Sequence, residues 1–120
     1  MLGETAQGRA MKMVPRSDTE RFIDLTAAEV VPFLERAASE AGRLIESRPQ
    51  DGALTARVRH GLQPITLEVT FQEMDVDEEH GTVVRVVGLG LAERDLGARN
   101  TTQSYFAALG HALTDGASDD

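Results

Sequence analysis

Residues 53–91, ALTARVRHGLQPITLEVTFQEMDVDEEHGTVVRVVGLGL, decide the fold of this chain. Within them, residues 65–72 alternate apolar and polar side chains over eight positions, and the apolar ones are β-branched, aliphatic or aromatic. A period of two predicts a strand with one buried and one solvated face. Residues 54–59 alternate in the same way, so the segment is expected to begin as a β-hairpin.

The turn of this hairpin fixes its register. Gly61 tolerates a positive φ, which a tight turn requires. A turn at Gly61 and Leu62 aligns the apolar residues of both strands, pairing Val58 with Ile65, Ala56 with Leu67, and Leu54 with Val69. A slip of one residue would mix polar and apolar side chains on each face, so the predicted register is specific.

A third strand is expected from Thr82 to Leu91. Val84 and Val86 continue the alternation, but the apolar phase then shifts beside Gly88 and Gly90. A phase shift beside glycines predicts a bulge or a strong bend. If the bend turns the following apolar residues outward, they form an exposed strip of the kind that marks an interface, made of Val87, Leu89 and Leu91.

The flanking segments predict helices and short strands. Thr26 and Glu29 form a capping box, and apolar residues at helical spacing follow as far as Gly42, with Pro32 expected to kink the helix. A last helix is expected to begin at Asn100, or at Asp95, and to end at Gly116. Short strands are expected at Glu20–Leu25, on an edge, and at Arg43–Arg48, before a turn at Pro49–Gly52.

Together these elements predict an α+β fold: a curved antiparallel sheet of four to five strands with two helices packed on its concave face. Residues 1–16 are expected to be a flexible arm, residues 17–115 a single domain, and residues 116–120 a disordered acidic tail. The expected core comprises Phe22, Val30, Leu34, Leu54, Val58, Ile65, Leu67, Val69, Phe71, Val84, Val86, Phe106, Leu109 and Leu113.

Composition excludes several classes of function. The 120 residues carry a formal charge of −8, which disfavours binding to the phosphates of nucleic acids. There is no cysteine, so disulfides, thiol chemistry and cysteine-based zinc sites are absent. No apolar run is long enough to cross a membrane, and the N-terminal residues lack the apolar core of a secretory signal. We therefore expect a cytoplasmic protein that binds neither membranes nor nucleic acids.

Neither a metal site nor a catalytic motif is predicted. Asp75, Asp77 and Glu79 alternate like the start of an EF-hand loop, but the glycine and glutamate that such a loop requires are replaced by His80 and Val86. The three histidines have no second ligand at metal-binding spacing. No cofactor is expected, and the only polar groups that could serve acid–base catalysis are Glu68, Tyr105 and His111.

Three arginines, Arg57, Arg59 and Arg85, are expected on the outer face of the sheet near Glu68. Two interpretations remain open. They pair with acidic residues across the strands of a solvated face, or they form a docking surface for an acidic partner.

The order of elements, with a strand, a kinked helix, curled antiparallel strands and a long C-terminal helix, resembles a short helix-grip domain of the START or polyketide-cyclase type. The segment Asp95–Asn100, running into the last helix, is also similar to an Asp-Leu-Gly-x-Asn turn of small bacterial α+β proteins, with one extra residue before Asn100. The resemblance implies that an apolar ligand could lie between sheet and helix. The side chains that would line such a cavity are Phe33, Phe71 and Tyr105.

From these observations we expect a non-enzymatic protein-interaction or assembly domain that associates with itself or with another protein. Its expected interface combines the apolar strip with the three arginines. The alternatives are a binding protein for an apolar small molecule and a small cyclase-like enzyme.

Overall fold

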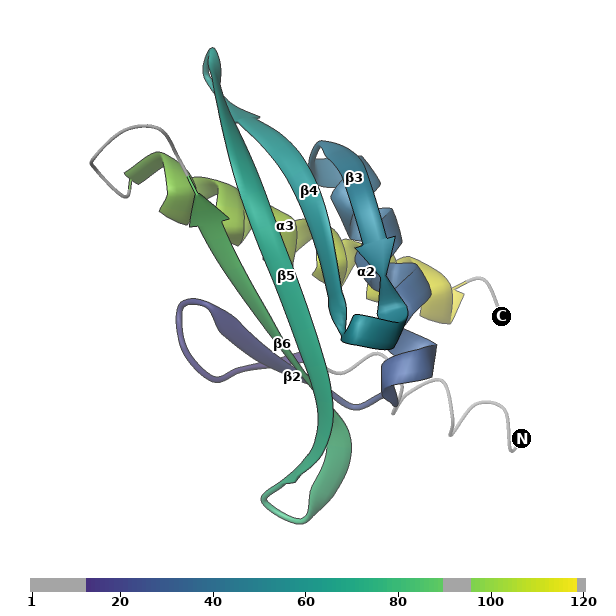
Figure 1. Ribbon diagram of the computed structural model, residues 1–120. Helices are drawn as coiled ribbons and strands as arrows, with labels where there is room; N and C mark the ends of the chain where they lie inside the picture. The colour runs from purple at the N-terminus through teal and green to yellow at the C-terminus, as the bar shows by residue number, and fades with distance from the viewer. Residues whose placement is uncertain (1–12, 90–95, 119–120) are drawn as a thin grey trace.

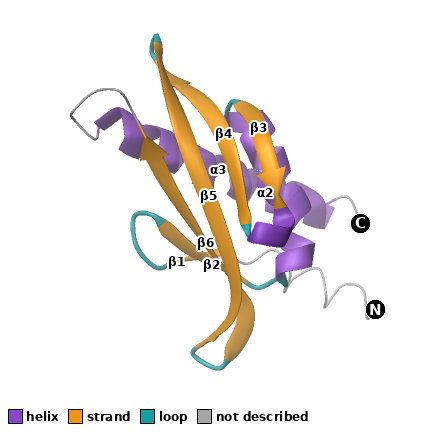
Figure 2. Cartoon of the chain, in the orientation of Figure 1, coloured by secondary structure: helices purple, strands orange, loops and turns teal. Residues whose placement is uncertain are grey.

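The computed structural model describes residues 13–89 and 96–118, which form an α+β fold (Figure 1). One antiparallel sheet has the strand order β1-β2-β6-β5-β4-β3, and two helices lie on one of its faces (Figure 2). The strands are β1 (Met13–Pro15), β2 (Glu20–Ile23), β3 (Arg43–Arg48), β4 (Ala53–His60), β5 (Gln63–Val76) and β6 (Glu79–Leu89). The helices are α2 (Ala27–Ala41), α3 (Leu96–Ser118) and the short 3₁₀ helix η1 (Pro49–Asp51).

The sheet has six strands, so the prediction of four to five strands was wrong. The additional strand is β1, which the sequence analysis placed in the flexible arm. It pairs with β2 from Met13 opposite Ile23 to Pro15 opposite Arg21, and therefore β2 is not an edge strand. Three residues are too few to show a period of two, which explains why the pattern missed β1. Residues 1–12 and 119–120 lie outside the described residues.

The predicted hairpin register is confirmed. Strands β4 and β5 pair Val58 with Ile65, Ala56 with Leu67 and Leu54 with Val69. The bulge predicted near Gly88 is wrong for the described part of β6, since its register with β5 is continuous from Thr66 opposite Leu89 to Val76 opposite Glu79. The register shift of this sheet lies instead in β3, between Leu44 and Glu46.

Strands β5 and β6 form a longer hairpin than expected. They pair as far as Val76 and Glu79, so only Asp77 and Glu78 form the turn. Both turn residues have positive φ, of 52° and 70°, as a two-residue type I′ turn requires. The two hairpins extend the molecule in opposite directions, to overall dimensions of 50 × 28 × 24 Å (Figure 1).

The helices follow the predicted signals with small shifts. The capping box at the start of α2 is confirmed, because Thr26 accepts from the amide of Glu29 while the Glu29 carboxylate accepts from the amide of Thr26. Helix α2 continues past Pro32 and ends at Gly42, whose amide donates to the carbonyl of Ala38. Helix α3 continues beyond Gly116. None of the described helices is long and apolar enough to cross a membrane.

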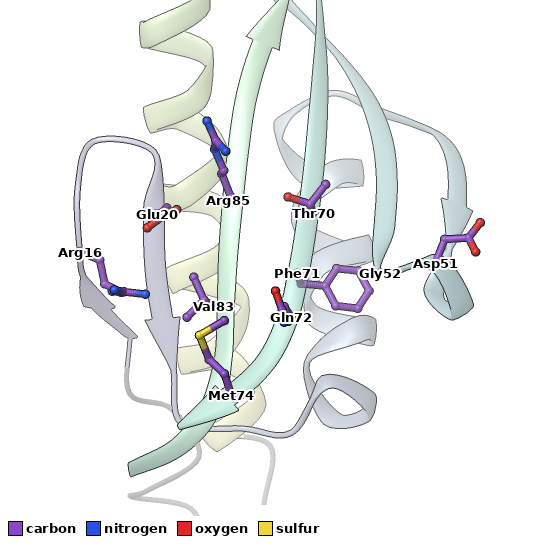
Figure 3. Close-up of a pocket in the computed structure, with 10 residues that line it drawn as sticks. All are labelled: Arg16, Glu20, Asp51, Gly52, Thr70, Phe71, Gln72, Met74, Val83 and Arg85. Atoms are coloured by element: carbon purple, nitrogen blue, oxygen red, sulfur yellow. The ribbon is translucent and has the colours of Figure 1, made fainter. Parts of the chain in front are cut away.

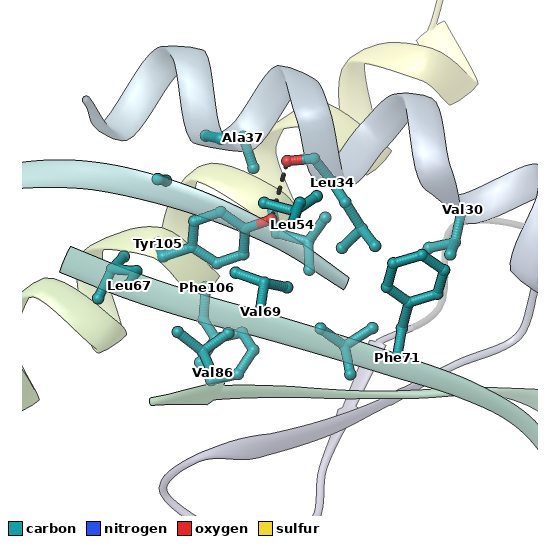
Figure 4. Close-up of a cluster of buried hydrophobic side chains, with 14 of the residues drawn as sticks. Val30, Leu34, Ala37, Leu54, Leu67, Val69, Phe71, Val86, Tyr105 and Phe106 are labelled. Atoms are coloured by element: carbon teal, nitrogen blue, oxygen red, sulfur yellow. Dashed lines mark hydrogen bonds between the residues drawn. The ribbon is translucent and has the colours of Figure 1, made fainter. Parts of the chain in front are cut away.

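The core lies between the sheet and the two helices (Figure 4). All fourteen side chains of the predicted core are buried, but Phe22 lies on the opposite face of the sheet, outside this cluster. Tyr105 of α3 is also fully buried, and its hydroxyl donates to the carbonyl of Leu34 in α2 at 2.8 Å. The Arg21 guanidinium of β2 lies 4.1 Å from the centre of the Phe106 ring. These contacts link both helices to each other and to the sheet.

Candidate functional site

The helices leave one face of the sheet uncovered. Residues directly opposite each other in antiparallel strands point to the same face of the sheet. The strand register therefore assigns the side chain of each paired residue to one face or the other. The row Leu54, Val69 and Val86 points toward the helices. The alternate rows define the helix-free face, whose main residues are Val14, Glu20, Phe22, Arg57, Arg59, Thr66, Glu68, Thr70, Gln72, Met74, Val83, Arg85, Val87 and Leu89.

A polar hollow lies on this face (Figure 3). The segment after β1 contributes Arg16, β2 contributes Glu20, and residues of β5 and β6 form its middle. Asp51 and Gly52 border the opposite side, where Gly52 accepts from the amide of Phe71 at 2.9 Å. The lining residues are Arg16, Glu20, Asp51, Gly52, Thr70, Phe71, Gln72, Met74, Val83 and Arg85.

Two cations in this hollow lack a described acidic partner. Glu20 and Arg85 are opposite each other across β2 and β6, yet they form no ion pair. Arg16 also makes no ion pair with any carboxylate that the structure describes. Figure 3 shows the Arg85 side chain directed along β6, away from Glu20. The hollow therefore offers two guanidinium groups, two carboxylates and neutral polar groups to a partner.

Apolar side chains are exposed at the other end of the helix-free face. Val87 is half-buried and Leu89 is 55% exposed. They reach this face by ordinary strand alternation, because Val84 and Val86 point to the helices and the residues between them point away. Leu91, the third residue of the predicted strip, lies outside the described residues.

Three arginines form a second basic region, which we call the arginine cluster: Arg43, Arg57 and Arg59. Arg57 and Arg59 are exposed on the helix-free face, as expected. Arg43 lies directly opposite Arg57 across β3 and β4. The sequence analysis missed it because it predicted no pairing between these strands, although the turn at residues 49–52 already implied one. A hollow beside the cluster is lined by Ala41, Gly42, Arg43, Ile45, Arg57 and Arg59.

Arg85 does not belong to this cluster. It is opposite Thr70, whereas Arg57 is opposite Thr66, four residues away along β5. Glu68 lies between these rows, and its carboxylate accepts from the Thr55 hydroxyl at 3.3 Å. Within the described residues Glu68 makes no ion pair with an arginine, so the cross-strand charge pairing considered for this face is not formed.

The residues predicted to line a ligand cavity lie in the core. Phe71 and Tyr105 are buried, and Phe33 is partly buried against the same cluster. Burial raises the pKa of Tyr105, and the negative charge of Glu35 raises it further. Tyr105 is therefore a neutral hydrogen-bond donor that links α3 to α2.

The three polar groups considered for catalysis are not brought together. Tyr105 is in the core, while Glu68 is on the helix-free face. His111 is exposed on α3, where its Nδ1 lies 3.6 Å from a carboxylate oxygen of Glu40. No common site for an acid–base reaction results from these positions.

His80 forms an arrangement that the sequence analysis did not predict. Its Nε2 lies 2.6 Å from Oε2 of Glu73, and its Nδ1 lies 2.7 Å from Oδ1 of Asp75. Only a protonated imidazole donates from both nitrogens. These two hydrogen bonds, first to Glu73 and then to Asp75, raise the pKa of His80.

Glu73 connects this pair to α2. Its Oε1 accepts from the amide of Ala27, in the first turn of the helix, at 2.9 Å. The hydrogen bond from His80 and the amide of Ala27 lower the pKa of Glu73. The arrangement fastens the long hairpin to the helix. In the described part of the chain, no three His, Cys, Asp or Glu side chains are placed to hold one metal ion.

Comparison with known proteins adds no assignment: no family model matches the chain, and no curated protein matches it. The functional argument therefore rests on the surface itself. Its main features are the apolar pair Val87 and Leu89, the polar hollow and the arginine cluster, all on the face of the sheet on which neither α2 nor α3 packs.

Proposed function

We propose that this chain is a non-enzymatic protein-interaction domain that self-associates through the helix-free face. The observation that carries the proposal is Leu89, which is 55% exposed on that face beside the half-buried Val87. An apolar region rimmed by polar groups is typical of a protein-binding surface. The unpaired arginines on the same face add hydrogen-bond donors of the kind that interfaces favour.

The edges of the sheet support a contact through the face. One edge strand, β1, has only three residues and ends in Pro15. The other edge strand, β3, contains the register shift near Ile45 and carries Arg43, Glu46 and Arg48. Short strands, proline, bulges and charges are the devices that prevent edge-to-edge pairing. Association by adding strands at either edge is therefore disfavoured.

The area of the face is adequate for a dimer. Six strands with five spacings of about 4.8 Å span about 24 Å, and the stretch of β5 from Thr66 to Met74 spans about 26 Å. The projected area of the face is therefore roughly 600 Å². Its accessible surface is larger than this projection because side chains make it uneven, so it is close to the ~800 Å² that each partner buries in a standard interface.

The test is the mass of the chain in solution after Leu89→Asp. We expect the wild-type chain to be a dimer of the 13.0 kDa protomer by light scattering and native mass spectrometry. An unpaired charge buried at the contact costs about 3 kcal/mol, so the dissociation constant should rise by about 100-fold or more. The variant should keep the wild-type circular dichroism spectrum, because Leu89 is outside the core.

Ser39→Asp is the control. Ser39 is exposed on α2, on the opposite side of the sheet, so this substitution adds one negative charge away from the helix-free face. It should leave the dimer intact. A wild-type chain that is monomeric at all concentrations would refute the proposal, as would a Leu89→Asp variant that dimerises like the wild type.

A further inference from the structure

The arginine cluster concentrates positive charge without a described counter-ion. Arg43 and Arg57 are directly opposite each other, and Arg59 follows Arg57 on the same face. Like charges placed opposite each other destabilise a sheet. Within the described residues, no carboxylate forms an ion pair with any of the three. Since the chain as a whole carries a charge of −8, an anionic group from outside the protomer best accounts for this cluster.

The chain also contains an acidic segment, whose charge is opposite to that of the arginine cluster. The cluster lies beside the beginning of β5, and the acidic segment follows the end of β5. The turn between β5 and β6 is formed by Asp77 and Glu78, both exposed, and Glu79 follows. Arg57 is opposite Thr66, so Asp77 lies eleven residues farther along the chain (77 − 66), about 36 Å away at 3.3 Å per residue. The acidic turn therefore cannot reach the arginine cluster of its own protomer.

We propose that two copies pair face to face in antiparallel orientation, so that the arginine cluster of each copy binds the acidic β5–β6 turn of the other. This inference rests on the proposed function and adds the orientation of the partner and the chemistry of the contact. One surface bears both complementary groups, as an isologous two-fold interface requires. Each dimer then contains the same charged contact twice.

The apolar residues of the face agree with this orientation. A two-fold axis near Thr70, midway between Thr66 and Met74 on β5, superposes the two ends of the face. The end that carries Val87 and Leu89 then lies over the partner's Met74, which is partly exposed and lines the polar hollow. The same rotation carries the row of Arg59, opposite Pro64, onto the row of the partner's Val76, so the arginine cluster lies beside the partner's acidic turn and apolar and charged contacts form together.

Reciprocal charge reversal tests this arrangement. The first variant carries Arg57→Glu and Arg59→Glu, and the second carries Glu78→Arg and Glu79→Arg. The second variant leaves Asp77 unchanged, because aspartate tolerates the positive φ there. At Glu78 and Glu79 it replaces one long side chain with another. All four residues are exposed, and both variants are expected to fold. The control is Arg36→Glu, on the exposed side of α2.

Each double variant alone should dimerise at least tenfold more weakly, because it places like charges at both contacts. An equimolar mixture should form a heterodimer with an affinity close to that of the wild type, because both contacts are then complementary. Native mass spectrometry distinguishes the heterodimer from the homodimers by mass. The control should leave the dimer unchanged, and added salt should weaken the wild-type dimer.

Several results would overturn the inference. If both double variants dimerise as the wild type does, the charged contacts are absent, while the proposed self-association still stands. If the first variant is monomeric and the mixture forms no heterodimer, the cluster does not bind the acidic turn. A monomeric wild-type chain would refute the proposed function itself, so the two failures are distinguishable.

Discussion

Two glycines, Gly42 and Gly110, should respond to the same substitution with opposite signs. A Cβ atom on Gly42 would overlap the backbone oxygen of Arg57 and would lie 3.0 Å from Cγ2 of Val58. Both neighbours belong to β4, which is paired on both sides and cannot move without breaking its hydrogen bonds. Among the residues that the structure describes, a Cβ atom on Gly110 would meet only Cε of Met13, at 3.4 Å, which is the end of a flexible side chain.

The expected magnitudes follow from these contacts. Gly42→Ala should lower the free energy of unfolding by about 1–3 kcal/mol, the usual cost of overpacking. Gly110→Ala lies within α3 and should raise it by about 0.5–1 kcal/mol, because alanine loses less backbone entropy in a helix than glycine. For 120 residues the entropy of unfolding is roughly 250 cal/mol/K, so 1 kcal/mol corresponds to about 4 °C.

The assay is thermal and urea unfolding followed by circular dichroism at one protein concentration, since dimerisation also changes the apparent stability. Gly42→Ala should lower Tm by about 4–12 °C, and Gly110→Ala should raise it by about 2–4 °C. If the free energies of unfolding of Gly42→Ala and the wild type differed by less than about 0.5 kcal/mol, the α2–β3 connection would not approach β4 as closely as described. Unequal urea m-values would show that the denatured state had changed instead.

Two further predictions concern hydrogen bonds. Tyr105→Phe should lower the free energy of unfolding by about 1 kcal/mol in urea titrations, because it removes the buried hydrogen bond to Leu34, whose carbonyl keeps its helical amide donor; a loss above about 3 kcal/mol would contradict this account. The raised pKa of His80 means that its two carboxylate contacts stabilise the folded state fully below pH 6.5 and are lost as the pH rises through the folded pKa. An NMR titration should place the His80 midpoint above 6.5, and a midpoint at or below 6.5 would show that the contacts do not form in solution.

The sequence was most informative where side chains alternate over many residues. The hairpin of β4 and β5 could be predicted to the residue, because any other register would expose Leu54 and Leu67. Strand β1 could not be predicted, because it is held mainly by backbone pairing with β2, and backbone hydrogen bonds leave no pattern in the side chains. The same limit explains why the prediction that β2 is an edge strand is wrong.

The sequence pattern of β6 was observed correctly, but the bulge predicted from it was wrong. The change of apolar phase after Val86 is real, and it was read as a bulge beside Gly88. The strand is instead regular, and the change of phase means that both of its faces carry apolar residues. Val87 and Leu89 therefore reach the helix-free face without any bend, and the glycine needs no special conformation there.

The candidate surface was only partly visible in the sequence. Arg57, Arg59 and Arg85 could be placed on the outer face from their alternation alone. Arg43 joins Arg57 through the pairing of two strands that the sequence links only by a turn. The contact between His80 and Glu73 depends on how far the β5–β6 hairpin extends. Residues 74–81 are rich in acidic side chains, which is typical of a loop, so the sequence did not predict that the strands pair there.

The burial of Tyr105 has a spectroscopic consequence. The chain has one tyrosine and no tryptophan, so all of its intrinsic ultraviolet fluorescence above 300 nm comes from a single ring between α2, α3 and the sheet. The fluorescence emission of the native chain therefore reports the environment of Tyr105 in the core and does not report changes at the helix-free face. Absorbance at 280 nm is correspondingly weak, so concentrations of this protein are better measured at the peptide bond.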